Sequence, residues 1–242
     1  MADPSFPAFA AADLPAVTME QMREVDRIMI EDLHIELVQM MENAGRNLAR
    51  LALSRFRPER VVVMAGSGGN GGGGMVAARH LANWGLEVSV VLSREPEALG
   101  AVAAHQLDVL DRMGVPVDTD PRPDALYVDA LIGYSLRSDP RGRAAELITW
   151  LRDRPGQVLS LDTPTGLDVT TGAALTPCVS ADATLTLAAP KIGLLHAPEV
   201  GELYLSDISV PPAVYEAFEM TMPADLFADG SVVRLTTSSS AP

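Results

Sequence analysis

The chain has 242 residues, enough for one large α/β domain, and its 18 basic and 32 acidic residues give a formal net charge of −14. Apolar residues make up 48% of the sequence and charged residues 21%, a balance that supports a hydrophobic core and excludes disorder as the main state. The negative charge disfavours nucleic acid and anionic membranes as partners, and the single cysteine, Cys178, excludes a disulfide framework and a multi-cysteine zinc site. We therefore expect a folded cytoplasmic protein.

Both ends of the chain have the composition of tails. The first residues are rich in Pro and Ala, and the last residues read Thr-Thr-Ser-Ser-Ser-Ala-Pro. Such segments offer little apolar surface to bury. We therefore expect flexible tails over residues 1–17 and 229–242, with a single domain over residues 18–228 between them.

Two helices are predicted before the first strand. Thr18 followed three residues later by Gln21 resembles a capping box and predicts the start of the first helix. The second helix follows a break near His34. The two apolar stripes at helical spacing consist of Met19, Met22, Val25 and Met29, and of Leu37, Met41, Ala44, Leu48 and Leu51.

From Arg60 onward, short apolar runs rich in β-branched residues alternate with helical stretches. The predicted strands are 61–64, 88–92, 115–117, 125–128, 158–161, 184–187 and 202–205. The predicted helices between them are 75–84, 97–112 and 143–151. This alternation predicts an α/β domain of three layers, in which helices cover both faces of a doubly wound, mostly parallel, Rossmann-like sheet.

Ligands of such sheets bind beyond the carboxyl ends of the strands, so polar residues that follow a strand are candidates for a site. Three features meet this condition: the glycine-rich segment 66–74, Asp129, and the segment 162–168, which reads Asp-Thr-Pro-Thr-Gly-Leu-Asp. We expect all three at one edge of the sheet.

Segment 66–74 holds seven glycines in nine positions, before a helix expected to begin near Met75. Backbone amides in such a loop can bind an anion, although a merely flexible turn is an alternative. A P-loop is excluded because no Gly-Lys-Ser/Thr follows. The pattern Gly-x-Gly-x-x-Gly through Gly66, Gly68 and Gly71 leaves a dehydrogenase open, but neither Glu87 nor Glu95 is well placed to bind a ribose.

Lys191 is the single lysine of the chain, against seventeen arginines, and it follows the predicted strand 184–187. Arginine does not replace lysine where a compact ammonium group is needed. The position therefore favours a role in a site, whereas a bias in composition with one arbitrary survivor is the alternative.

In their order and spacing, these residues give the chain a specific family resemblance over about residues 18–212. The matching segments are Met-Glu-Asn-Ala-Gly at 41–45, the glycine segment with Val-Ala-Ala-Arg-His-Leu at 76–81, Asp-Ala-Leu-Ile-Gly-Tyr at 129–134, Leu-Asp-Thr-Pro-Thr-Gly-Leu-Asp at 161–168, Asp182, Pro-Lys-Ile-Gly at 190–193 and Asp-Ile-Ser-Val-Pro at 207–211. The chain resembles the NAD(P)H-hydrate epimerases, which are built on the YjeF N-terminal domain.

The resemblance implies the YjeF N-terminal fold and an isomerase of metabolite repair. Such an enzyme interconverts the R and S forms of NADHX and NADPHX, the C6-hydrated forms of the reduced cofactors. A separate NAD(P)HX dehydratase then acts in the same pathway, and the resemblance favours a homodimer. Inversion at the hydrated carbon needs an acid–base group and a fixed ligand, with no redox partner.

The resemblance also implies roles for particular residues. Asp162 would be the catalytic acid–base group, with a cap on loop 163–166 as the alternative. A potassium ion would be held by Asn70, Asp129 and Thr165, with a plain loop residue as the alternative for Asp129. The residues expected to bind the nicotinamide dinucleotide are Gly69, Asn70, Gly71, Gly72, Gly73, Gly133, Tyr134, Ser135, Leu136, Arg137, Asp162 and Lys191.

The departures from the family pattern include three at positions expected to face the ligand or the ion. The usual loop reads Gly-Pro-Gly-Asn-Asn-Gly-Gly-Asp-Gly, whereas Gly69 and Gly73 stand here in place of the first Asn and the Asp, and Thr165 replaces a Ser. Losing two side chains that face the ligand leaves open a second hypothesis. The chain could be a noncatalytic nucleotide-binding or interaction module on the same fold.

Overall fold

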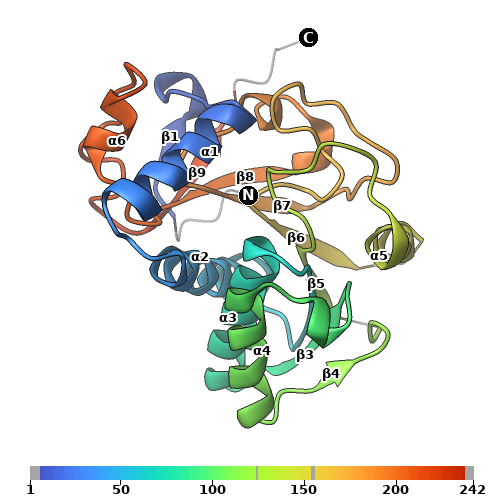
Figure 1. The fold of residues 1–242 in the computed structure, drawn as a ribbon. Helices are drawn as coiled ribbons and strands as arrows, with labels where there is room; N and C mark the ends of the chain where they lie inside the picture. The colour runs from blue at the N-terminus through green and yellow to red at the C-terminus, as the bar shows by residue number, and fades with distance from the viewer. Residues whose placement is uncertain (1–5, 124, 154–155, 238–242) are drawn as a thin grey trace.

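The computed structural model describes residues 6–123, 125–153 and 156–237. Within these ranges, nine strands form one sheet in the order β1-β9-β8-β7-β6-β5-β2-β3-β4, and the β8–β9 pair alone is antiparallel (Figure 1). The strands are β1 (Ala8–Ala10), β2 (Arg60–Ala65), β3 (Glu87–Leu92), β4 (Val117–Asp118), β5 (Leu126–Ala130), β6 (Gln157–Leu161), β7 (Ala183–Leu187), β8 (Glu202–Ser206) and β9 (Val232–Thr236). The mostly parallel α/β sheet predicted from the sequence is confirmed.

Two helices precede the central strands as the periodicity predicts, but β1 comes before both of them, so the prediction that they precede the first strand is wrong. The α-helices are α1 (Met19–Arg27), α2 (Leu37–Leu51), α3 (Gly69–Asn83), α4 (Ala101–Arg112), α5 (Gly142–Arg152) and α6 (Pro212–Glu216). Short helical turns lie at Ala11–Asp13, Ile28–Asp32, Ala52–Phe56, Pro96–Ala98, Ile192–Leu194 and Pro198–Val200. The capping box at the start of α1 is present: Gln21 N–H donates to Thr18 Oγ1 at 3.2 Å and Thr18 N–H donates to Gln21 Oε1 at 2.9 Å.

Helices cover both faces of the sheet, which explains the continuous apolar runs of its central strands. In β2, Val61 and Val63 point toward the layer of α2, α3 and α4, whereas Val62 and Met64 point toward α5. These four side chains are buried. Figure 1 shows α5 on the side of the sheet opposite α3 and α4, so the three-layer prediction is confirmed.

The predicted tails are wrong where they form two strands, β1 and β9, at one end of the sheet. Ala8–Ala10 pairs in parallel with β9, which itself pairs with β8. Val232, Val233 and Leu235 are buried, and this short apolar run drives the pairing despite the polar residues that follow it. Residues 1–5 and 238–242 of the predicted tails lie outside the described residues.

The strand predicted at 115–117 begins later than expected. The structure places β4 at Val117–Asp118, after Pro116. Proline has no N–H to donate to a ladder, so it limits the strand here.

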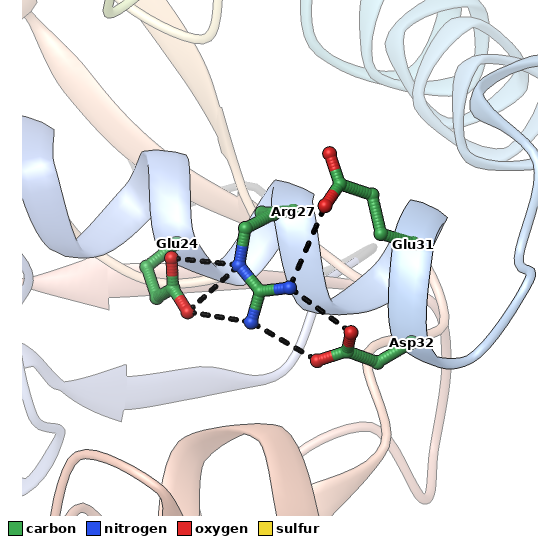
Figure 2. A network of polar contacts seen from close by, with 4 residues as sticks. All are labelled: Glu24, Arg27, Glu31 and Asp32. Carbon is green, nitrogen blue, oxygen red and sulfur yellow. Dashed lines mark hydrogen bonds and ion pairs between the residues drawn. The ribbon is translucent and has the colours of Figure 1, made fainter.

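A cluster of charged side chains marks the end of α1 and the turn that follows. Figure 2 shows Arg27 between Glu24, Glu31 and Asp32, with its guanidinium 2.7 Å from Glu24 and 3.0 Å from Asp32. All four side chains are at least 39% exposed, so water screens these ion pairs and they add little to stability.

None of the helices in the described part of the chain is long and apolar enough to cross a membrane.

Candidate functional site

The site lies where the strand order reverses. The chain passes from β2 to β3 in one direction, whereas the other neighbour of β2 is β5, so a crevice forms beyond the carboxyl ends of β2 and β5. Gly66, directly after β2, donates its N–H to Ala130 O at 3.0 Å and holds the two strand ends together. A cavity of about 310 Å³ lies beyond them.

Residues from distant parts of the chain line this cavity, which we call the central cavity. Its walls come from α1, α2, the first turn of α3 and the segments that follow β5, β6 and β7. Its polar lining residues are Asp26, Asn70, Tyr134, Ser135, Asp162 and Lys191, and its apolar lining includes Met22, Met40 and Met41.

The glycine-rich segment is largely helical, because α3 begins at Gly69 instead of near Met75. The predicted loop is therefore corrected to a short turn followed by a glycine-rich first helical turn. The backbones approach one another too closely for a side chain: an added Cβ would lie 1.7 Å from Leu131 O at Gly66, and 1.9 Å from Gly66 O at Gly71. Packing of strand ends against the helix start thus requires glycine at both positions.

The early start of α3 changes which amides can bind an anion. The first turn of a helix leaves its N–H groups without intrahelical acceptors, and this applies to Gly69, Asn70 and Gly71. Gly72 N–H, in contrast, donates to Gly68 O at 3.0 Å. The amide of Gly72 is therefore not free to bind a ligand, which corrects the prediction for this residue. Gly73 lies beyond the turn with free amides, but it lines the central cavity.

Gly69 and Gly73, which replace the usual Asn and Asp of the family loop, differ in the space around them. At Gly69, an added Cβ would meet no described atom within 4 Å, so the usual asparagine would fit. At Gly73, an added Cβ would lie 2.9 Å from Leu161 Cδ2, so the usual aspartate would require that side chain to move.

Asp162 and Lys191 form a buried ion pair on the wall of the central cavity. Lys191 Nζ lies 2.5 Å from Asp162 Oδ1, and it also donates to Thr186 Oγ1 at 3.0 Å and to Leu187 O at 2.8 Å. The exposed fractions of the two side chains are 0% for Lys191 and 4% for Asp162. Asp162 adopts a positive φ of 69°, a conformation that is costly for a non-glycine residue and is concentrated at functional sites.

The second carboxylate oxygen of Asp162 accepts a hydrogen bond from Tyr134 N–H, with Oδ2 and N 2.9 Å apart. Its partners are therefore Lys191 and Tyr134, and not the loop 163–166 that the alternative interpretation assigned to it. The structure brings together Asp162, Lys191 and Tyr134 as the sequence predicted.

Tyr134 also contacts a residue that the sequence analysis missed. Its hydroxyl donates to Asp26 Oδ2 at 2.6 Å. Burial raises the pKa of Asp26 above the usual range of carboxyl groups, although the hydrogen bond from Tyr134 acts in the opposite direction. Burial and the nearby charge of Asp26 raise the pKa of the Tyr134 hydroxyl. A charged residue at position 26, next to the apolar stripe and four positions after Met22, was the signal that could have revealed it.

Asp129 lies inside β5 rather than after it, and it is fully buried. Its carboxylate accepts hydrogen bonds from Thr165 Oγ1 at 2.7 Å, Thr165 N at 2.8 Å and Ser160 Oγ at 2.9 Å. Burial raises its pKa despite these hydrogen bonds, and it forms no ion pair within the described ranges. Asp129 is thus a buried acid without a cationic side chain beside it.

Of the other two residues predicted to hold the ion, Thr165 contacts this acid, whereas Asn70 lies on the wall of the central cavity. The Asn70 side chain lines the central cavity, and its Nδ2 is buried without a hydrogen-bond partner among the described residues. Thr165 Oγ1 also lies 3.1 Å from Ile132 O. Carboxylate, hydroxyl and carbonyl oxygens suit a hard cation. No cluster of three or more His, Cys, Asp or Glu side chains that could hold a metal exists within the described chain.

A second cavity adjoins the first and shares Gly69, Asn70, Gly133 and Ser135 with it. Leu136 lines this cavity, whereas Arg137 is exposed and lines neither of the two. Two arginines that the sequence analysis did not select, Arg94 after β3 and Arg141 before α5, line it as well. Cationic side chains beside free helix amides are suited to phosphate groups.

Cys178 lies away from both cavities. It is half-buried against an apolar cluster, and burial raises the pKa of its thiol to about 12. A thiol that stays protonated is a poor nucleophile, so Cys178 is suited to packing and not to catalysis.

Comparisons with known proteins agree with this architecture. The family described as YjeF-related protein N-terminus matches residues 37–193. The crystal structure of the yeast protein ynu0 superposes with a TM-score of 0.81 and covers 92% of this chain and 100% of that one, at 24% sequence identity. At this identity, the likeness concerns the fold.

Several relatives match over most of the chain. An NAD(P)H-hydrate epimerase from Dehalogenimonas lykanthroporepellens is 45% identical over 231 residues, which cover 92% of this chain and 93% of that protein. One from Rhodopirellula baltica is 33% identical and covers 86% of this chain and 89% of its own. A bifunctional NAD(P)H-hydrate repair enzyme from Salinibacter ruber is 38% identical, but the match covers 42% of that longer protein and 84% of this one.

Proposed function

Since this chain belongs to the YjeF-related N-terminal family and matches NAD(P)H-hydrate epimerases over most of their length, we propose that it interconverts the R and S forms of NADHX and NADPHX. The protein is accordingly an isomerase of metabolite repair. The observation that carries the proposal is the buried pair of Asp162 and Lys191 on the wall of the central cavity. An intact pair of this kind favours an enzyme over a noncatalytic binding module.

The chemistry follows from the hydrated carbon of the substrate. C6 carries a hydroxyl group beside the ring nitrogen, so loss of that hydroxyl as water leaves an iminium ion. Return of water to the other face inverts the centre. We assign to Asp162 the transfer of a proton at this hydroxyl, while Lys191 and Tyr134 N–H fix the orientation of its carboxylate.

We place different parts of the substrate in the two adjoining cavities. We place the hydrated nicotinamide ring in the central cavity, against Met22, Met40 and Met41. The phosphates then lie at the first turn of α3, whose free amides belong to Gly69, Asn70 and Gly71. Arg94 and Arg141 in the second cavity supply local positive charge in a chain whose net charge is −14.

The test of this proposal is a coupled assay. Purified protein in potassium buffer is added to R-NADHX together with an S-specific NAD(P)HX dehydratase, and the formation of NADH is followed. We expect formation of NADH well above the spontaneous rate of epimerisation. A rate equal to the spontaneous one, with ligand still bound, would support the noncatalytic module instead.

We also propose that a potassium ion binds beside Asp129, held by Asn70, Asp129 and Thr165. The buried carboxylate without an ion pair, with the hydroxyl of Thr165 beside it, supports a monovalent cation. The ion would supply positive charge next to a carboxylate that is 0% exposed. The ion would take no part in proton transfer, which we assign to Asp162.

Potassium is expected to raise the melting temperature of the ligand-free protein, because an ion that binds the folded chain alone stabilises it by about 2.7 kcal/mol at 100 times its dissociation constant. The measurement compares potassium chloride with tetramethylammonium chloride at equal ionic strength. Asp129→Asn should lose the difference, whereas the exposed Asp108→Asn should keep it. Equal melting temperatures of the wild-type protein in both salts would contradict the potassium site.

A homodimer is a further proposal, supported by three large apolar side chains on neighbouring segments. Ile30, Leu33 and Val38 are 38%, 44% and 42% exposed. Contiguous exposed apolar surface is typical of interaction sites. Sedimentation velocity at micromolar concentration should give the mass of two chains, and Val38→Glu should shift the protein toward the monomer. A monomer for the wild-type protein would contradict this proposal.

We place the enzyme in the cytoplasm, where its single cysteine suits a reducing compartment. The bifunctional relatives are named as repair enzymes, and the epimerase match spans about two fifths of the one from Salinibacter ruber. We propose that an NAD(P)HX dehydratase consumes the product of this chain in the same pathway.

A further inference from the structure

Inversion by loss and return of water requires proton transfer on both faces of the ring, and one carboxylate on one face does not provide it. The hydroxyl leaves from one face of the ring, and water adds to the other face. Each event needs a group that gives or takes a proton on its own side of C6. Where two carboxyl groups act on opposite sides of a similar carbon, as in inverting glycosidases, they stand roughly 6.5–9.5 Å apart to leave room for the water.

The central cavity holds a second carboxyl group, that of Asp26 on α1. Tyr134 connects it to the first one: the backbone N–H of Tyr134 donates to Asp162 Oδ2 at 2.9 Å, and its hydroxyl donates to Asp26 Oδ2 at 2.6 Å. Tyr134 thus contacts one carboxyl group at its backbone and the other at its hydroxyl, and both carboxyl groups line the same cavity.

The surroundings of Asp26 make its carboxyl group easier to protonate than an exposed aspartate. Its neighbour Arg27 does not neutralise it, because that guanidinium is directed to the exposed carboxylates of Glu24, Glu31 and Asp32 (Figure 2). Burial raises the pKa of Asp26 and the hydrogen bond from Tyr134 lowers it, while the charge of Asp162 raises it and that of Lys191 lowers it. Asp162 differs in having the ammonium of Lys191 at 2.5 Å.

The fold holds α1 in place over the site. Val17, just before α1, forms a bridge with Lys191: Val17 N–H donates to Pro190 O at 2.8 Å, and Ile192 N–H donates to Val17 O at 3.1 Å. The segment that carries the ammonium thus also anchors the helix that carries Asp26. Both carboxyl groups are positioned by the same segment.

Building on the proposed epimerase function, we infer that Asp26, held by the hydroxyl of Tyr134, is the second acid–base group of the site and serves the face of the ring opposite to Asp162. In one direction, Asp26 gives its proton to the C6 hydroxyl, the C6–O bond breaks as water leaves, and the lone pair of the ring nitrogen forms the C=N bond. Water then adds to the other face, Asp162 accepts its proton, and the electron pair returns to nitrogen. In the reverse direction the two carboxyl groups exchange roles.

The experiment follows the two faces separately. R-NADHX and S-NADHX, each labelled with ¹⁸O at C6, are incubated with protein, and both the loss of label to water and the conversion to the other epimer are measured. The wild-type protein should do both from either epimer. Asp26→Asn should lower epimerisation by roughly 10²–10⁴-fold, yet one epimer should still lose its label with retention of configuration.

With Asp162→Asn, the opposite epimer should be the one that still loses its label. A merely structural role of these residues would not produce such a mirrored pattern. Tyr134→Phe, which keeps Asp26 but removes its hydrogen bond, should impair the same epimer as Asp26→Asn, and it serves as the second variant if Asp26→Asn does not fold. The exposed Glu24→Gln on the same helix is the matched control and should behave as the wild-type protein.

The outcomes separate this inference from the proposed function. Unchanged epimerisation by Asp26→Asn, or an equal loss of label exchange from both epimers, would overturn the role of Asp26 while leaving the epimerase in place. A wild-type protein that exchanges no label and converts neither epimer above the spontaneous rate would overturn the proposed function and this inference together.

Discussion

Asparagine in place of Asp162 is expected to lower the rate of epimerisation of NADHX by roughly 10²–10⁴-fold, because it removes the proton transfer while keeping the shape of the side chain. The single amide oxygen can still accept one of the two hydrogen bonds of the carboxylate, either from Tyr134 N–H, now 2.9 Å from Oδ2, or from Lys191 Nζ. The Kd of the substrate should therefore change little. The coupled assay with added dehydratase gives the rate, and quenching of protein fluorescence by NADHX gives the binding.

Asp168→Asn is the matched control for this variant. Asp168 belongs to the same segment, but its carboxylate accepts hydrogen bonds from the backbone N–H groups of Thr170 and Thr171, which an asparagine can also do. The control should keep its activity. Turnover by Asp162→Asn close to that of the wild-type protein would refute the assignment of Asp162.

Methionine in place of Lys191 is expected to destabilise the protein by about 3–5 kcal/mol, since it leaves the buried carboxylate of Asp162 without its cation. It also removes hydrogen bonds to Thr186 Oγ1 and Leu187 O. Urea denaturation followed by circular dichroism measures the change in the free energy of unfolding. Epimerisation should fall together with stability.

The double variant Asp162→Asn with Lys191→Met separates charge from packing. With no carboxylate left unpaired, it should be more stable than Lys191→Met alone, and the difference gives the coupling between the two residues. Arg112→Met, at an exposed ion pair on α4, should leave stability nearly unchanged. If Lys191→Met unfolds at the same urea concentration as the wild-type protein, the pair is not the buried interaction described above.

Most of the fold could be predicted because the local spacing of apolar residues indicates its helices and strands. The stripe from Met19 to Met29 and the central strands are buried as their spacing indicates. The start of α3 could not be predicted in this way, since glycine has the lowest helix propensity apart from proline. There the close approach of Gly71 to Gly66 decides the conformation, and that contact joins a helix to a strand end.

The site was predicted in part for a related reason. Asp162 and Lys191 follow strands of a doubly wound sheet, and topology alone places such residues at one edge. Asp26 lies on a helix far away in the sequence, and it reaches the cavity because Val17 pairs with the segment of Lys191. The spacing of apolar residues does not predict a pairing between segments so far apart in the sequence. The strand β9 was missed because its apolar run is short and leads into a polar end.

The first turn of α3 has a consequence for how this enzyme loses function. Its donors at Gly69 and Gly71 are peptide groups, so no truncation of a side chain there deletes them. Damage at this edge comes instead from added atoms, as any side chain at Gly66 or Gly71 would force β2, β5 and the helix apart. Substitutions that enlarge a residue should therefore dominate the inactivating changes around the proposed phosphate position, whereas truncations should dominate around the proposed position of the hydrated ring, where we assign roles to the side chains of Asp162 and Lys191.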